Sequence, residues 1–239
     1  MNTLRVCRIA LAAASLAGLA TASGATPAAA RKPLLPDLVP SAAHLAETYF
    51  SEEEGRTLLR FPTVILNLGD APVEVVGRRK RRSDPMLAEQ TLFYRGGKRG
   101  ARAMGEFEFH EEHYHWHLLA VAEYRLLAAD ETVVAGGEKV SFCLMDTAPV
   151  DPPLPGARRK PHYLTCPVNR SLKGFVTGIS RGWSDVYPAN LYGQWVDVTG
   201  LPPGDYTLEV RLDPEGRLLE KSTENNTARV PVTIPPPAG

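Results

Sequence analysis

Short runs of alternating apolar and polar residues recur along most of the chain, and a period of two is typical of β-strands. The runs are rich in β-branched and aromatic residues and end at clusters of proline, glycine, asparagine and aspartate. They predict strands over residues 58–66, 73–76, 118–127, 139–145, 194–198, 206–212 and 228–234, with one short helix over 42–49. The expected fold is all-β: an antiparallel β-sandwich core with long loops, from Val76 to Phe107 and from Asp146 to Gln194, and few short helices.

The N-terminus has the pattern of a targeting segment. Arg5 and Arg8 precede an apolar run from Ile9 to Ala20, and Ala20-Thr21-Ala22 fits a small-residue cleavage site. The apolar run is too short to span a bilayer, and no later run is longer. We therefore expect residues 1–30 to be a signal peptide and disordered leader, residues 33–235 to form one folded domain, and the mature protein to be secreted.

Composition narrows the range of partners. The 27 basic and 27 acidic residues give a formal net charge of zero, which argues against nucleic acid or a membrane surface as a partner. The basic residues nevertheless gather in the predicted loop between Arg78 and Arg102. That loop is either a solvated, mobile segment or a docking patch for an acidic partner. Outside the cytosol, the two cysteines beyond the leader, Cys143 and Cys166, are expected to form a disulfide.

Four of the six histidines fall within eight residues, at His110, His113, His115 and His117. In an extended strand the last three would lie on one face, because side chains alternate. Tyr114 and Trp116 would then face the core. Three neutral imidazoles on one face predict a transition-metal site for copper, zinc or iron, and the spacing alone does not choose among them.

Sequence blocks along the whole predicted domain resemble the catalytic domain of the lysyl oxidases, which are copper amine oxidases that act on lysine side chains. The blocks occur in the family's order. They are Leu35–Pro40, Leu58–Pro62, Phe107–His117, Lys139–Leu144, Gly178–Ser180, Asp185–Tyr187, Gln194–Thr199, Pro203–Tyr206 and Glu220–Asn226. The resemblance identifies the chain as a pared-down, bacterial-type secreted member, because Glu112, Trp183 and Gly193 stand where the family has cysteines.

The resemblance implies residue roles that spacing does not supply. His113, His115 and His117 would hold Cu(II), with His110 as a possible further ligand. Lys139 and Tyr187 match the lysine and tyrosine from which the family makes its lysine tyrosylquinone.

The implied activity is the oxidation of a primary amine or a lysine-containing protein. The amine attacks the quinone carbonyl, a base removes the α-proton, and O2 reoxidises the cofactor, yielding an aldehyde, ammonia and hydrogen peroxide. Asp185, two residues before Tyr187, is our candidate for the base.

A second metal is also implied by the resemblance. Asp37, the Leu38 carbonyl, Glu220, Asn225 and Asn226 match positions of the family's calcium site, and Ca(II) prefers six to eight oxygen ligands. One acidic ligand of the family is replaced by Ser222 in this chain. An ordinary turn is the alternative interpretation of these residues.

Two other classes of function remain open. The C-terminal blocks also resemble secreted immunoglobulin-like domains, so a non-enzymatic adhesion or metal-binding module is one alternative. A zinc hydrolase that uses the same imidazoles is the other. The adhesion module leaves the histidines, Lys139 and Tyr187 without a role, whereas the hydrolase lacks an assigned carboxylate partner.

Overall fold

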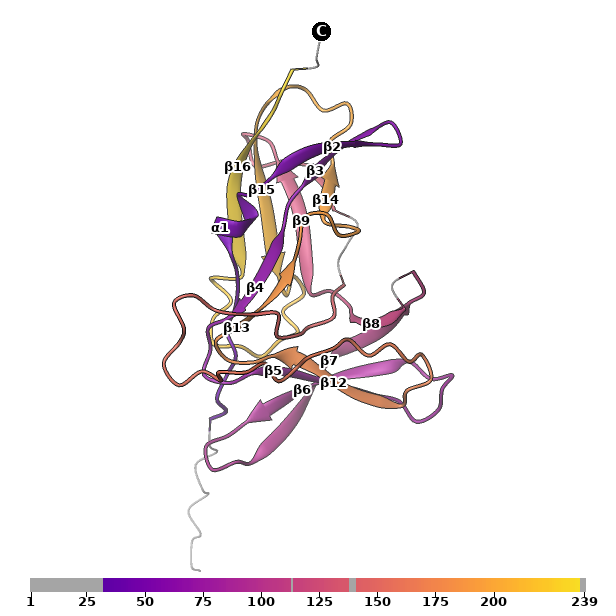
Figure 1. Cartoon of the computed structure of the whole chain (residues 1–239), viewed down its shortest axis with the longest axis vertical. Helices are drawn as coiled ribbons and strands as arrows, with labels where there is room; N and C mark the ends of the chain where they lie inside the picture. The colour runs from indigo at the N-terminus through magenta and orange to yellow at the C-terminus, as the bar shows by residue number, and fades with distance from the viewer. Residues whose placement is uncertain (1–31, 113, 138–140, 237–239) are drawn as a thin grey trace, which may run out of the picture. The chain divides into compact units, whose positions relative to one another are not determined.

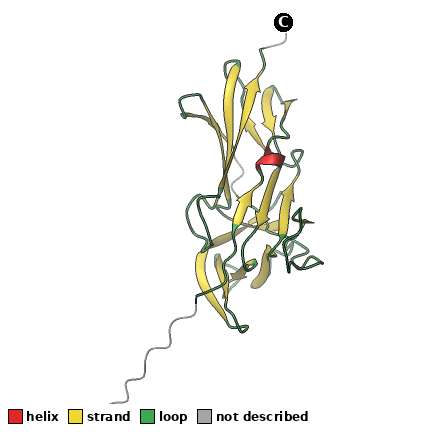
Figure 2. Ribbon diagram, turned by 90° about the vertical axis from the view of Figure 1, so that its left-hand side faces the viewer, coloured by secondary structure: helices red, strands yellow, loops and turns green. Residues whose placement is uncertain are grey.

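The computed structural model describes residues 32–112, 114–137 and 141–236. The predicted signal peptide, His113 and Lys139 therefore lie outside the described residues. Within the described ranges the chain forms sixteen strands and one four-residue helix, so the all-β prediction is confirmed (Figure 2). No helix in these ranges is long and apolar enough to span a membrane.

Five antiparallel strands form the sheet that carries the histidines, in the order β12-β5-β6-β7-β8 (Figure 1). Their bounds are β5 Val73–Arg78, β6 Met86–Phe93, β7 Arg99–His110, β8 His115–Leu118 and β12 Gly174–Ile179. One face of this sheet is aromatic: Phe107 and Phe175 have ring centroids 4.8 Å apart, and Trp116 lies 5.7 Å from Phe175. Alternate residues therefore face outward, among them Glu108, His115 and His117.

A short segment joins the two edges of this sheet. Leu118 and Phe142 exchange backbone hydrogen bonds of 2.8 and 3.1 Å, and the Gly178 N–H donates to the Leu144 carbonyl at 3.0 Å. Residues 141–145 thus lie between β8 and β12. They do not form the alternating strand predicted for 139–145, because within 141–145 only Phe142 pairs in a ladder, through a single bridge to Leu118.

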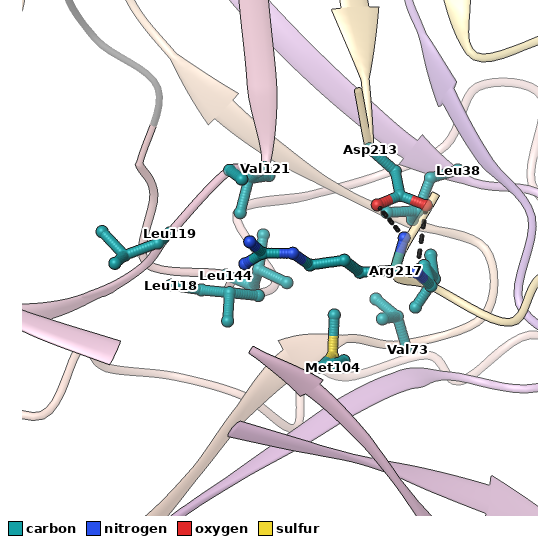
Figure 3. Close-up of a pocket in the computed structure, with 11 residues that line it drawn as sticks. Leu38, Val73, Met104, Leu118, Leu119, Val121, Leu144, Asp213 and Arg217 are labelled. Atoms are coloured by element: carbon teal, nitrogen blue, oxygen red, sulfur yellow. Dashed lines mark hydrogen bonds between the residues drawn. The ribbon is translucent and has the colours of Figure 1, made fainter. Parts of the chain in front are cut away.

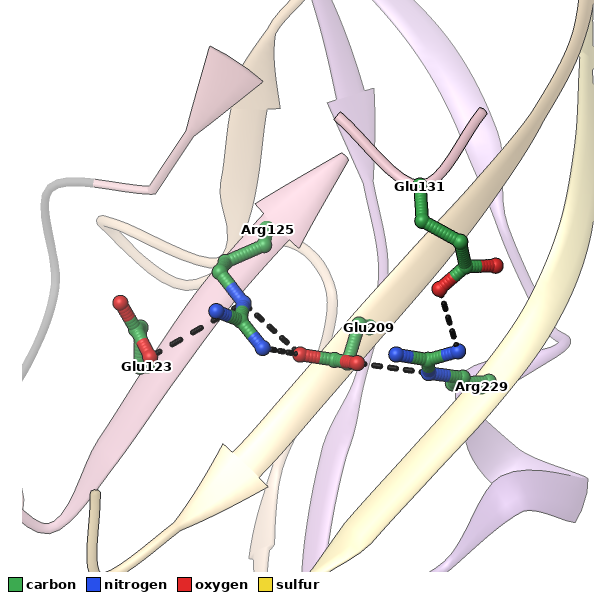
Figure 4. Close-up of polar contacts among 5 residues, drawn as sticks. All are labelled: Glu123, Arg125, Glu131, Glu209 and Arg229. Atoms are coloured by element: carbon green, nitrogen blue, oxygen red, sulfur yellow. Dashed lines mark hydrogen bonds and ion pairs between the residues drawn. The ribbon is translucent and has the colours of Figure 1, made fainter. Parts of the chain in front are cut away.

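A second sheet supplies much of the hydrophobic core, with the order β10-β9-β15-β16. Its strands are β9 Ala122–Leu127, β10 Val133–Gly136, β15 Gly204–Leu212 and β16 Thr227–Ile234. Leu126, Leu208 and Val210 are at most 1% exposed. The other face carries Arg125, Glu209 and Arg229, which form the ion-pair cluster of Figure 4.

Two smaller antiparallel sheets complete the described chain, with the orders β1-β4-β13-β11 and β14-β3-β2. Their elements are β1 Leu38–Pro40, β2 Tyr49–Glu53, β3 Arg56–Arg60, β4 Thr63–Asn67, β11 Ala148–Pro149, β13 Trp183–Tyr187 and β14 Trp195–Asp197, with helix α1 at Ala42–Leu45. Pairing of β4 with both β1 and β13 places Tyr187 opposite Thr63, beside the core.

Several predicted elements need correction. The strand expected over 58–66 is divided at Phe61–Pro62, because proline cannot donate to a ladder. The strand expected over 118–127 is interrupted at 119–121, where Ala120 has a φ of +56°. The predicted loop between Val76 and Phe107 consists largely of β6 and β7, whereas the basic run from Arg79 to Arg82 lies in the connection between β5 and β6.

Candidate active site

The described histidines come together where β7 and β8 meet. The register pairs His110 with His115 and Glu108 with His117, and all four side chains lie on the outer face of the sheet. The Nε2 atoms of His115 and His117 are 2.7 Å apart, and their ring centroids are 4.5 Å apart. Two ring nitrogens this close share one electrophile, either a proton or a metal ion.

Ser141 fixes the orientation of this histidine pair. Its Oγ lies 3.1 Å from His117 Nδ1 and 3.3 Å from His110 Nε2. His117 is only 3% exposed, so its ring is confined between Ser141 and His115. A hydrogen bond to the far ring nitrogen is what orients a metal-ligating histidine in known sites. Ser141 was not singled out from the sequence, because only the folded chain brings it beside β8.

The donor set fits a metal such as copper. Two nitrogens that bind one ion at about 2 Å each stand roughly 3 Å apart, close to the separation of the His115 and His117 atoms. The described residues alone do not contain a group of three or more ligating side chains arranged around one point. His113, the third predicted ligand, lies outside the described residues. His110 Nε2 faces Ser141 and also lies 3.8 Å from Glu108 Oε2, which suits a supporting histidine.

The predicted role of Tyr114 is wrong. Its side chain is 70% exposed, and its φ of +55° places it in the turn before β8. The strand begins only at His115, so the extended geometry expected from His113 onward does not hold through Tyr114. Trp116 is buried as predicted, and its Nε1–H donates to the Asn169 carbonyl at 3.1 Å.

Tyr187, the predicted quinone precursor, ends strand β13 with its phenol directed into the protein. The phenol oxygen lies 2.5 Å from the Cys143 carbonyl oxygen and 2.8 Å from Asp185 Oδ2, so one proton faces two acceptors. Burial, together with the negative charge of Asp185, raises the pKa of the Tyr187 phenol well above its ordinary value. The ring packs edge-on against Phe142, with centroids 4.7 Å apart.

Asp185, the predicted base, is 1% exposed and fully engaged. One oxygen accepts from Tyr187 and, at 3.3 Å, from the Met145 N–H. The other accepts from Thr147 Oγ1 at 3.0 Å. These contacts fix the carboxylate against the phenol, so that Asp185 can take a proton from the Tyr187 ring or from a group bound beside it.

One three-residue segment links the histidine pair to Tyr187. Ser141 contacts His117, the Phe142 backbone pairs with Leu118, and the Cys143 carbonyl accepts from Tyr187. Three residues span about 7 Å when extended, so both groups lie along the same short stretch of chain. Lys139 precedes this segment by two residues in the sequence. The expected disulfide between Cys143 and Cys166 is present and anchors the segment.

The residues predicted to bind calcium also come together. Leu38 N–H donates to Glu220 Oε2 at 2.9 Å, Asn226 Nδ2 donates to Glu220 Oε1 at 2.7 Å, and Asn225 Nδ2 donates to Asp37 Oδ1 at 3.3 Å. Among the described residues, the side-chain oxygens of Asn225 and Asn226 are buried without a hydrogen-bond partner. Buried unpaired oxygens beside two carboxylates are the donors that a calcium ion prefers.

The electrostatics of this cluster favour a cation. Burial raises the pKa of the Glu220 carboxyl to about 7, and the charges of Asp213 and Asp37 act in the same direction. Asp213 was missed in the sequence, where it reads only as a turn residue before a proline. The approach of the chain is tight here, since a Cβ at Gly69 would lie 2.4 Å from the Pro36 carbonyl carbon. Glycine at this position therefore lets the Asp37 segment reach the cluster.

A small apolar pocket lies between these two sites (Figure 3). Leu118 and Leu144 line it near the histidines, and Asp213 lines it near Glu220. Its volume of about 20 Å³ is enough for roughly one water molecule. The Arg217 side chain extends across the pocket, while Asp213 accepts from the Arg217 and Leu218 N–H groups at 2.9 and 3.0 Å. The pocket is too small to bind a lysine side chain.

Comparison with known proteins identifies the family of the chain. The sequence model of the lysyl oxidase family matches residues 95–235, which include β8, Ser141 and Tyr187. Human lysyl oxidase homolog 1 is 30% identical over 195 residues, covering 77% of this chain and 27% of that protein. Mouse lysyl oxidase homolog 2 is 29% identical over 195 residues, covering 80% and 23%. Human lysyl oxidase homolog 2 is 36% identical over 120 residues, covering 49% and 14%.

The described members of the histidine cluster and Tyr187 all lie within the matched region of this all-β chain. The chain belongs to the lysyl oxidase family. It spans about a quarter of the length of the curated relatives it matches over 195 residues.

Proposed function

We propose that this protein is a copper amine oxidase that converts primary amines, including lysine side chains, to aldehydes with release of ammonia and hydrogen peroxide. One observation carries the proposal: the Ser141–Cys143 segment contacts both the His115–His117 pair and the Tyr187 phenol. Family membership supports the same activity. An adhesion module would have no use for this arrangement, and a zinc hydrolase would have no use for Tyr187.

The metal ligands in this proposal are His113, His115 and His117, with Ser141 and His110 as supporting groups. Bound copper would supply, with O2, the oxidising equivalents that turn the Tyr187 ring, joined to Lys139, into the electrophilic lysine tyrosylquinone. Three imidazoles without a thiolate suit copper in oxygen chemistry. The neutral donor set also leaves the metal its full positive charge.

The chain's own residues perform the proton transfers. Asp185 accepts the phenol proton of Tyr187, over the 2.8 Å hydrogen bond between them, when the ring is oxidised. Once it has released that proton to solvent, the same carboxylate lies beside the reacting ring and receives the α-proton of the bound amine. Thr147 and the Met145 N–H hold the carboxylate in place during both transfers.

We also propose a calcium ion at Asp37, Glu220, Asn225 and Asn226, and secretion of the mature chain. The two unpaired asparagine oxygens support the ion. The Cys143–Cys166 disulfide and the apolar N-terminal run support secretion, because disulfides persist in oxidising compartments.

The test is an assay of the copper-loaded protein with a simple primary amine such as butylamine. We expect hydrogen peroxide and butyraldehyde in equal amounts, and a coloured adduct with phenylhydrazine that reports a protein carbonyl. Metal analysis should find one copper per chain. Amine turnover with zinc alone, or a copper-loaded protein that neither reacts with phenylhydrazine nor produces peroxide, would contradict the proposal.

A further inference from the structure

A groove opens at the end of the five-stranded sheet where β5 ends and β6 and β12 begin, and residues of both sheet faces line it, Phe175 of the aromatic face among them. It has a volume of about 780 Å³ and is lined by β5, the start of β6 and the start of β12. The lining residues that matter here are Val76, Arg78, Lys80, Leu87, Lys173 and Val176. A volume of this size is in the range of ligand-binding clefts.

The floor of the groove is apolar and open to solvent. Leu87 is 53% exposed and Val176 is 49% exposed, and Val76 lies directly opposite Val176 in the register. Leu87 pairs with Arg78 on the neighbouring strand. The floor is therefore a patch of three aliphatic side chains bordered by a cation.

The rim of the groove is basic and ordered. Arg79 holds the segment in shape: its guanidinium donates to the Leu172 carbonyl at 2.8 Å and to the Arg82 carbonyl at 2.7 Å. It also lies over the Trp116 ring, 5.0 Å from the centroid. Arg79 thus ties the basic run to the segment before β12 and to β8.

Two of the rim cations are not neutralised. Arg78 lies 3.3 Å from the Glu89 carboxylate, and the Asp84 carboxylate accepts from the Arg81 N–H. In the part of the chain that the structure describes, neither Lys80 nor Lys173 has an acidic partner, and both are exposed. The groove therefore offers positive charge to a ligand.

The aliphatic floor of the groove lies on the same face of the sheet as the histidine pair. Leu87 on β6 pairs with Glu106 on β7, and Glu108, two residues further along β7, pairs with His117 on β8. Neighbouring strands are about 4.8 Å apart, so β6 and β8 are separated by roughly 10 Å. The exposed carboxylates of Glu106 and Glu108 lie between the groove and the histidines.

The charge on the surface changes from negative beside the histidines to positive in the groove. A cationic ammonium is favoured beside Glu106 and Glu108, next to the histidines, whereas an anion is favoured at Lys80 and Lys173 in the groove. An apolar side chain fits the floor between them. A free alkylamine would use only the first of these features.

We propose that the groove is a substrate subsite for an acidic side chain of a lysine-containing peptide, placed four or five residues from the lysine that is oxidised. The inference rests on the proposed function, because it is that reaction which brings a lysine to the histidine face. Lys80 follows β5, which lies three strands from β8, so roughly 14 Å of extended chain, or about four residues, sets the lower limit of the spacing. An aliphatic residue between the lysine and the acid would occupy Val76, Leu87 and Val176.

The experiment compares two blocked peptides with the copper-loaded protein. One peptide has a lysine, a leucine two residues after it, and aspartates four and five residues after it. The other has asparagines in place of the two aspartates. We expect the aspartate peptide to have a kcat/KM about tenfold higher, mainly through KM, because two exposed ion pairs are together worth about that factor. The variant Lys80→Ser/Lys173→Ser should bring the ratio of the two peptides close to one.

Two controls make the result specific. The variant Arg159→Ser/Lys160→Ser removes the same charge from exposed residues outside the groove and should keep the tenfold ratio. A third peptide with its aspartates nine and ten residues from the lysine should behave like the asparagine peptide. Equal rates for all three peptides, or an advantage that ignores the spacing or survives loss of Lys80 and Lys173, would overturn the inference.

A binding measurement separates this inference from the proposed function. The aspartate peptide with norleucine in place of lysine, carrying a fluorophore, should bind the copper-free protein, and the Lys80→Ser/Lys173→Ser variant should bind it about tenfold more weakly. Binding without any amine oxidation would overturn the oxidase proposal and leave the groove standing. Oxidation of butylamine together with equal rates for the aspartate and asparagine peptides would overturn the proposed subsite alone.

Discussion

Two buried glutamates on the C-terminal part of the chain have opposite environments. Glu209 on β15 is 1% exposed in its side chain, and both of its oxygens accept from arginines: Arg125 donates at 2.7 Å and Arg229 at 2.6 Å (Figure 4). Burial acts to raise the pKa of the Glu209 carboxyl, but the hydrogen bonds and charges of the arginines outweigh it, so this pKa is lowered. Glu220 faces amides and other carboxylates, and its pKa is raised to about 7.

The difference separates a polar cluster whose charges and hydrogen bonds are satisfied within the chain from one that we propose to bind a cation. The Glu209 cluster satisfies its own charge, so it stabilises the sheet and needs nothing more. The Glu220 cluster leaves two asparagine oxygens unpaired among the described residues and accumulates negative charge. The histidine pair resembles the second kind, since two ring nitrogens 2.7 Å apart converge on one point. Both incomplete clusters belong to the proposed metal chemistry.

The largest effect is expected at the histidine pair. His117→Ala should abolish copper binding and lower amine oxidase activity by ~10³-fold or more, because the oxidising metal is lost. His162→Ala, which changes an exposed histidine elsewhere in the chain, should leave copper content and activity at the wild-type level. Copper content by mass spectrometry and phenylhydrazine reactivity check both variants. A normal carbonyl yield in His117→Ala would remove the proposed role of the metal.

Removing the complete cluster should cost stability without changing metal binding. Glu209→Ala leaves Arg125 and Arg229 without their shared carboxylate, and breaking such a pair costs about 3 to 4 kcal/mol at most when the arginines are partly exposed. Urea unfolding measures the loss. The calcium response of this variant should equal that of the wild type; a lost response would mean that the two clusters are coupled.

The two glutamates should give opposite dependences of stability on pH in the presence of a chelator. Because the folded pKa of Glu220 is about 7, its contribution is fully present below pH 4.5 and is lost as the pH rises through 7, by up to about 3 kcal/mol. The Glu209 contribution is present above pH 4.5 and is lost as the pH falls through its lowered pKa. Unfolding of the wild type, Glu209→Gln and Glu220→Gln from pH 3 to 8 separates the two slopes. Identical slopes in both variants would contradict the comparison.

Calcium should give the smallest of these effects. At ten times the dissociation constant, an ion that binds only the folded chain stabilises it by about 1.4 kcal/mol. Addition of calcium at this concentration should therefore raise the melting temperature of the wild type and offset about half of the loss of stability near pH 7. Glu220→Gln should remove this increment, whereas magnesium, which favours a smaller and more rigid shell, should not replace calcium. An unchanged calcium response in Glu220→Gln would exclude the proposed site.

Local pattern was enough to predict the fold class and the histidine cluster. Alternation and turn residues identified eight of the sixteen described strands, and the spacing of His115 and His117 put both on one face. Pattern failed where a single backbone conformation decides the outcome: the positive φ of Tyr114 and that of Ala120 each ended an expected strand. Strands β6 and β7 were taken for part of a loop because the basic residues Arg99 and Arg102 interrupt the apolar pattern of β7.

The periodicity of the sequence could not predict contacts between segments that are distant along the chain. Ser141 reaches His117 across 24 residues, and Tyr187 reaches Cys143 across 44. Spacing carries no information about such distances, so only the family resemblance pointed to Tyr187. The groove at Lys80 and Lys173 depends on strand register and could not be foreseen at all. Asp213 was missed for the same reason, since its neighbour Glu220 meets it only after the turn is formed.

The central claim is that copper joins Lys139 to Tyr187 in one cofactor, and peptide mapping by mass spectrometry tests it most directly. Protein matured with copper and O2 should release the peptide containing Tyr187 covalently joined to the peptide containing Lys139, and protein kept copper-free should release both separately. Recovery of both peptides unmodified from a preparation that actively oxidises amines would contradict the account.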